Sequence, residues 1–102
     1  MAASNKVPDN LNYLSNISFR LSMEDAPHLT WFCQSVKYGG FSGASLYVNA
    51  SAPTLSRAVA QLELTLGEKL LYRNAKHFQL TSSGEKYYQQ FSTLFRQLDE
   101  NW

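Results

Sequence analysis

Apolar residues recur at helical spacing from residue 27 onwards and predict a helix followed by a shorter one. The apolar positions of the first helix share one face: Leu29, Phe32, Cys33 and Val36. Pro27 suits a first helical turn, with Asp25 or Ala26 just before it, and Gly39-Gly40 ends this helix. Ser42 can cap the short helix that follows. The pattern therefore predicts a helix with one apolar face, followed by a short second helix that carries Ala44 and Val48.

A third helix is predicted after a tight turn at Asn49 and Ala50. Ser51 is a favourable N-cap, Pro53 is tolerated in the first turn, and Gly67 ends the helix. One stripe is expected to be buried: Leu55, Val59, Leu62 and Leu66. The opposite face is polar: Thr54, Arg57 and Gln61. A polar helix face presented after a tight turn suits the major groove of DNA.

Two short apolar segments, residues 70–72 and 78–80, flank the polar stretch 73–77 and predict a hairpin with a basic tip. A last helix begins at Ser82, which has capping-box spacing with Glu85, although Thr81 could equally serve as the cap. Large apolar residues recur along it at spacings of three and four: Tyr88, Phe91, Phe95, Leu98 and Trp102. A seam this apolar either packs on the domain or forms a two-fold contact with another copy.

Residues 1–24 form an N-terminal extension, whose first ten residues read as a loose polar arm. The segment from residue 11 fits one helical face: Leu11, Leu14, Ile17 and Leu21. Apolar and polar residues also alternate over residues 17–24, which is a strand pattern. We favour the helix for this segment.

The order of elements is helix, helix, helix, hairpin, helix. This is the order of a winged helix-turn-helix module with a trailing helix. The sequence thus predicts a mainly α fold, in which residues 25–81 form a three-helix core with a two-stranded wing. Residues 82–102 are predicted to form a long C-terminal linker helix.

The composition fits one small domain, with 102 residues and 44% hydrophobic content. The single cysteine, Cys33, lies in an apolar run, which indicates a buried, inert thiol and a reducing compartment. No apolar stretch approaches the ~20 residues that span a bilayer, and no charged-then-apolar leader opens the chain. We expect a soluble, cytoplasmic protein with no membrane partner.

The net charge is only +1, but it is unevenly distributed. Residues 31–81 carry five Lys and Arg against two Glu, a net charge of +3, whereas residues 1–30 and 82–102 each sum to −1. Positive charge is therefore concentrated in the middle of the chain, where the third helix lies, and this distribution favours nucleic-acid binding. A charge of +3 is also compatible with a neutral protein of uneven charge.

Residues suited to catalysis are sparse. His28 and His77 are the only histidines, and neither stands at metal-ligand spacing with Cys33 or an acidic residue. The sequence has no nucleophile elbow and no Gly-rich phosphate loop. We therefore expect no enzyme, no cofactor and no metal site.

The run from Leu29 to Thr81 resembles, without a gap, the N-terminal DNA-binding domain of LysR-type bacterial transcriptional regulators. The matching pieces stand in order: Leu29, Phe32 and Val36; Gly39-Gly40-Phe41-Ser42; Ala44-Ser45; Ser51-Ala52-Pro53-Thr54-Leu55-Ser56-Arg57; Leu62-Glu63; Leu66-Gly67; Leu70-Leu71-Tyr72-Arg73; and Leu80-Thr81 with Gly84. Each piece is weak by itself, and together they cover about half of the chain. The trailing helix is similar to that family's linker helix, which pairs two subunits. The resemblance implies a homodimer that binds an inverted-repeat operator in double-stranded DNA.

The resemblance also implies roles for individual residues. Base-contacting positions fall on Ala52, Pro53, Ser56 and Arg57. Arg57 can pair with guanine. Contacts to the DNA backbone fall on Ser51, Thr54, Arg73 and Thr81, with Lys76 at the wing tip. Arg73 could instead be a surface residue that balances Glu63 or Glu68. The dimer seam would be formed by Tyr88, Phe91, Phe95, Leu98 and Trp102.

The chain departs from the family pattern in several places. The family usually has glutamine where this chain has Ala52, so one base-reading hydrogen bond is expected to be missing. Gly40, Ser45 and Tyr72 also differ from the common residues and should be tolerated. The residues before Met23 are extra, and the family's two-lobed effector-binding domain does not follow, so we expect no effector site here.

Two alternative functions stay open at this point. The chain could be a protein-interaction module that forms mixed dimers with a full-length regulator. It could also be an architectural DNA binder with weak sequence preference, an interpretation that the missing glutamine at Ala52 strengthens. The third helix by itself could also be an ordinary amphipathic core helix.

Overall fold

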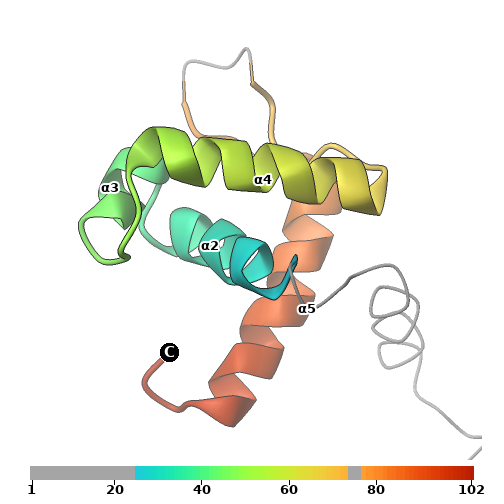
Figure 1. Cartoon of the computed structure of the whole chain (residues 1–102). Helices are drawn as coiled ribbons and strands as arrows, with labels where there is room; N and C mark the ends of the chain where they lie inside the picture. Colours follow the sequence, from blue (N-terminus) through green and yellow to red (C-terminus); the bar gives the residue numbers. More distant parts are fainter. Residues whose placement is uncertain (1–24, 74–76) are drawn as a thin grey trace, which may run out of the picture.

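The computed structural model describes residues 25–73 and 77–102, which form helices α2 (Ala26–Lys37), α3 (Phe41–Ser45), α4 (Ala52–Leu66) and α5 (Ser82–Leu98). Helix α4 lies across α2 and α3, and α5 packs on α2 (Figure 1). The extension over residues 1–24 and the predicted wing tip, with Lys76, lie outside the described residues. The predicted mainly α architecture is confirmed.

Helix α2 begins as the sequence predicts, with Asp25 as its N-cap residue and Pro27 in its first turn. Asp25 is buried, and its Oδ1 accepts a hydrogen bond from the Thr65 hydroxyl at 3.4 Å. Because Thr65 lies near the end of α4, this contact joins the N-terminus of α2 to the C-terminal turn of α4.

Helix α3 begins two residues earlier than expected, because its N-cap is Gly40 and not Ser42, so the prediction that Ser42 caps it is wrong. Its N-cap is Gly40, whose φ of 146° is open only to glycine without strain. The Gly40 carbonyl accepts the first helical hydrogen bond from the Ala44 amide at 3.0 Å. The glycine pair thus supplies both the end of α2 and the sharp entry into α3.

Helix α4 has the predicted cap and the predicted buried face. The Ser51 side chain accepts a hydrogen bond from the Thr54 amide at 3.3 Å, and the helix ends at Gly67. The predicted stripe is buried: Leu55, Val59, Leu62 and Leu66. Three of these join the apolar residues of α2, Leu29, Phe32 and Cys33, in one core cluster. This packing directs the other face of α4 away from the core.

The predicted hairpin is present as a single antiparallel bridge between Leu71 and Leu80. On either side of the bridge, the Tyr72 amide donates to the Gln79 carbonyl and the Thr81 amide donates to the Leu70 carbonyl, both at 3.0 Å. In the described residues, no strand extends beyond this bridge. The two-stranded wing therefore stays a prediction beyond this bridge.

Helix α5 takes Thr81 as its N-cap, the alternative that the sequence left open. The Thr81 hydroxyl oxygen accepts a hydrogen bond from the Gly84 amide at 3.0 Å. Gly84 is buried, and a side chain there would collide with the Leu70 carbonyl oxygen. A glycine is needed at this position because the helix crosses the hairpin at close range.

The predicted apolar seam of α5 is divided among three environments. Phe91 lies in the core with Tyr87, and Tyr88 and Phe95 pack partly buried against that core. Trp102 lies beyond the helix end, because α5 ends at Leu98 rather than at residue 102. The buried face of α5 includes Tyr87, which is not part of the predicted seam. The seam itself therefore lies partly on the buried face and partly on the exposed face of the helix.

Trp102 returns to the core instead of extending the helix. Its ring packs on Phe95 with centroids 5.3 Å apart, and its carbonyl oxygen accepts from Lys37 Nζ at 3.0 Å. Leu98, in contrast, is 77% exposed. Of the two outcomes that the sequence allowed for this seam, packing on the domain holds for most of it, and Leu98 is left open for another contact.

Candidate nucleic-acid interface

Arg57 projects from the outward face of α4. Its side chain is exposed, and Nη2 makes one long contact of 3.5 Å with the Thr54 hydroxyl oxygen. Because the stripe on the opposite side of the helix is buried, the guanidinium is directed away from the domain. The group is free to reach a partner outside the chain.

The hydroxyl groups of Ser51 and Thr54, at the start of α4, differ in whether their protons have an acceptor within the described residues. The Ser51 hydroxyl donates to Thr54 Oγ1 at 2.9 Å while accepting from the Thr54 amide. Thr54 Oγ1 accepts from both Ser51 and Arg57, and in the part of the chain that the structure describes its own proton has no acceptor. The N-terminus of α4 thus presents one free hydroxyl proton beside Arg57.

Ala52 and Pro53 supply the apolar part of this surface. Pro53 is exposed and Ala52 is half-buried at the first turn of α4. Neither side chain has a hydrogen-bonding group. Four sequence-predicted base-reading positions therefore lie on two adjacent turns of one helix, and only Ser56 and Arg57 among them can make polar contacts.

Arg73 does not extend freely from the hairpin. Its Nη1 donates to Ser56 Oγ at 2.9 Å, and its Nη2 contacts the Ser56 carbonyl oxygen at 3.4 Å. Nη2 also pairs with Glu63 Oε1 at 3.3 Å, with the Arg73 side chain 35% exposed. The proposed partner Glu63 is therefore confirmed as a contact, and a contact from Arg73 to the DNA backbone stays a prediction.

The Glu63 carboxylate is buried and joins α4 to the hairpin. Its Oε2 accepts from the Leu70 amide at 2.7 Å and the Leu71 amide at 3.2 Å, while Oε1 binds Arg73. From the sequence, Glu63 is considered as a charge that balances Arg73 and as part of the family resemblance, and no burial is predicted for its side chain. Its spacing of four from Val59 and three from Leu66 places it on the buried side of α4, which was the available signal.

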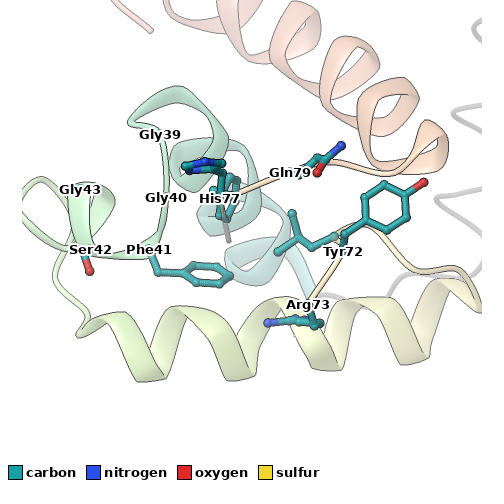
Figure 2. Close-up of a pocket in the computed structure, with 11 residues that line it drawn as sticks. Gly39, Gly40, Phe41, Ser42, Gly43, Tyr72, Arg73, His77 and Gln79 are labelled. Atoms are coloured by element: carbon teal, nitrogen blue, oxygen red, sulfur yellow. The ribbon is translucent and has the colours of Figure 1, made fainter. Parts of the chain in front are cut away.

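A groove separates α3 from the hairpin, and Figure 2 shows Phe41 reaching into it while Arg73 lies close to α4. The rings of Phe41 and Phe78 meet edge to face with centroids 5.2 Å apart. The Arg73 guanidinium carbon lies 5.8 Å from the centre of the Phe41 ring. The Arg73 side chain therefore lies against both α3 and α4.

The Thr81 hydroxyl, which the family resemblance assigns to the DNA backbone, is already engaged in hydrogen bonds within the chain. Its hydroxyl donates to the Lys69 carbonyl at 2.6 Å and accepts from the Gly84 amide. A hydroxyl has one proton, so this side chain has none left for a phosphate oxygen. The structure gives Thr81 a capping role at α5.

Three further findings concern Cys33, metal-binding side chains and membrane-spanning helices. Burial raises the pKa of the Cys33 thiol from 9.0 to about 12, which matches the predicted inert thiol. Residues 25–73 and 77–102 contain no group of three or more His, Cys, Asp or Glu side chains placed to hold a metal ion. In the same ranges, no helix has the length and apolar character required to cross a bilayer.

Residues 27–85 match the family described as "Bacterial regulatory helix-turn-helix protein, lysR family". The HTH-type transcriptional regulator YtlI of Bacillus subtilis (strain 168) is 39% identical over 64 residues, which are 63% of this chain and 20% of YtlI. This chain thus spans about a fifth of the length of that relative.

Two similar solved structures contain DNA. The BenM DNA-binding domain in complex with catB site 1 DNA has a TM-score of 0.67 and 31% identity, with 72% of this chain and 80% of that chain covered. Vibrio fischeri DarR in complex with DNA has a TM-score of 0.65 and 31% identity, with 79% of this chain and 27% of that chain covered.

Proposed function

The chain belongs to the lysR family of bacterial regulatory helix-turn-helix proteins, and from this premise we propose that it binds double-stranded DNA sequence-specifically as the DNA-binding domain of a transcription regulator. The observation that carries the proposal is the exposed Arg57 on the outward face of α4. In this proposal α4 enters the major groove, and Arg57 donates to guanine O6 and N7.

Contacts to the DNA backbone would fix the register of α4 in the groove. The free Thr54 hydroxyl proton supports a phosphate contact at the first turn, next to Ser51. The hairpin over residues 73–78 would lie over the backbone, with Lys76 at its tip. Such contacts add affinity without distinguishing base pairs.

The proposed module acts as a homodimer on an inverted repeat in the bacterial nucleoid. Two copies joined through α5 would place their α4 helices in successive major grooves, about 34–36 Å apart. The exposed Leu98 supports a further contact at the end of α5. One subunit would then occupy each half-site.

Selection of bound fragments from a random pool of duplex DNA tests binding, sequence preference and symmetry together. We expect enrichment of an inverted repeat, and an affinity that falls steeply as salt rises from 50 to about 200 mM. Absence of DNA binding at the lowest salt, combined with a stable complex with a full-length regulator, would instead identify a protein-interaction module.

Arg57→Ala tests the residue on which the proposal depends. We expect it to weaken operator binding by about 1–3 kcal/mol and to flatten the preference at one base position, because a bidentate contact is lost. Arg96→Ala is the matched control, since Arg96 is an exposed arginine on α5. Equal affinity of wild type and Arg57→Ala for operator and random DNA would contradict the role of Arg57.

A further inference from the structure

We propose that Arg73 is a positioning residue that makes Ser56 a hydrogen-bond donor toward the DNA. Ser56 would then read an acceptor atom on one base edge in the major groove. The inference rests on the proposed function and adds to it a specificity determinant at one base position. It assigns Arg73 a role in sequence preference that is separate from any contact of Arg73 with the DNA backbone.

The guanidinium of Arg73 is held in place on the side of α4. It donates to Ser56 Oγ at 2.9 Å and to the Ser56 carbonyl at 3.4 Å, and it pairs with Glu63 Oε1 at 3.3 Å. Glu63 is itself held by two backbone amides of the hairpin. Three of the five N–H groups that any guanidinium carries are thus committed within the chain.

The Ser56 hydroxyl is left with a proton to donate. A serine oxygen has two lone pairs and one proton, and Arg73 occupies one lone pair. Among the residues that the structure describes, the Ser56 hydroxyl donates to no acceptor. A charged donor also polarises the hydroxyl and makes its proton a better donor, while its positive charge disfavours a second incoming donor.

This polarity favours some bases over others. In the major groove guanine N7 and O6, adenine N7 and thymine O4 are acceptors, whereas cytosine N4 is a donor. Ser56 positioned in this way should therefore disfavour cytosine at the base that it faces. Its contribution matters in this chain because Ala52 and Pro53 have no polar group, so Ser56 and Arg57 carry all polar base reading among the four predicted positions.

The test compares relative affinities for all four bases at each half-site position, using wild type, Ser56→Ala, Arg73→Met and the double variant. We expect each single variant to lose about 3–10-fold of preference at the same base position, the range for one hydrogen bond. The double variant should lose no more than either single variant. The matched control Arg57→Ala should change the preference at a different position.

Arg73→Lys separates positioning from charge. A lysine keeps the positive charge, but its single ammonium cannot reproduce the fixed fork that contacts Ser56 and Glu63 together. We expect Arg73→Lys to lose the same base preference as Arg73→Met. Partial unfolding of any variant lowers its affinity for all bases equally and leaves their ratio unchanged, so the ratio reports the positioning role.

The possible results separate the two proposals. If wild type binds DNA selectively but Arg73→Met weakens binding uniformly at every base, Arg73 contacts phosphate or only supports the fold, and the inference is overturned while the proposed function stands. The same holds if Ser56→Ala leaves every base preference unchanged. If wild type binds no DNA, the proposed function fails and the inference fails with it.

Discussion

At the scale of single residues, the Glu63 carboxylate joins three parts of the fold. It accepts from the Leu70 and Leu71 amides and binds Arg73, which in turn contacts Ser56. Buried backbone amides require an acceptor, and here a side chain of α4 provides it in place of a neighbouring strand. Glu63 therefore links the hairpin to α4 through three hydrogen bonds, in addition to the packing of Leu70 and Leu71 in the core.

Glu63→Ala should lower the free energy of unfolding, by about 1–3 kcal/mol for each buried donor left without an acceptor. Glu63→Gln is the control: its amide oxygen, in the place of Oε2, can still accept from both backbone amides, and only the contact of Oε1 with Arg73 is lost, so it should cost less. Urea denaturation of the three proteins measures the difference. Equal stability of the alanine variant and wild type would show that water replaces the carboxylate.

The buried Cys33 thiol should make the free energy of unfolding depend on pH. Burial raises the pKa of the Cys33 thiol from 9.0 to about 12. The contribution of this group to the free energy of unfolding is therefore complete below pH 9.0 and is lost progressively up to about pH 12. Within this window the unfolded thiol ionises first, and stability should fall by up to about 1.4 kcal/mol per pH unit. Urea denaturation at pH 7 and pH 10 checks this, with Cys33→Ala as the control that lacks this decline.

At the scale of elements, the start of α5 is determined by its close approach to the hairpin. The Thr81 side chain caps the helix, and its hydroxyl donates to the Lys69 carbonyl beside the same crossing. Gly84 allows the first turn to lie against the Leu70 carbonyl. These contacts direct α5 across the core and determine which of its faces is buried.

Gly84→Ala should destabilise the protein by about 1–3 kcal/mol or more, because the added methyl group collides with backbone rather than with a movable side chain. Ser82→Ala, at an exposed position of the same turn, should change stability little. Thermal unfolding of both variants is the measurement. A Gly84→Ala protein as stable as wild type would mean that the helix can shift away from the hairpin.

At the scale of the whole molecule, the apolar surface of α5 is mostly used within the chain. Phe91 lies in the core and Trp102 covers Phe95, while Leu98 is 77% exposed. A contact between two copies through this helix would therefore depend on its exposed end more than on the complete predicted seam. Burying an exposed leucine side chain is worth about 1.5–3 kcal/mol.

Leu98→Glu should weaken self-association without lowering thermal stability, because the side chain is exposed in the single chain. Gln97→Glu is the matched control, since it adds the same charge at the neighbouring exposed position. Sedimentation equilibrium of wild type and both variants measures the dimer affinity. If the two variants dimerise as strongly as wild type, the proposed contact at the end of α5 is wrong.

Much of this fold could be predicted from local patterns. The caps at Ser51 and Gly67, the buried stripe of α4 and the exposed position of Arg57 all follow from helical periodicity and capping chemistry. These features depend on residues within a few positions of one another. They are properties that the sequence determines by itself.

The tertiary structure alone decided the contacts between distant segments. Arg73 meets Ser56 across 17 residues, and Lys37 meets the Trp102 carbonyl across 65 residues. The same applies to the buried face of α5, because spacing identifies an apolar seam but not the surface that it meets. The sequence thus determined which face of α4 is exposed, because helical periodicity is a local property. The tertiary packing determined which polar groups on that face have partners within the described residues, because those partners come from distant segments.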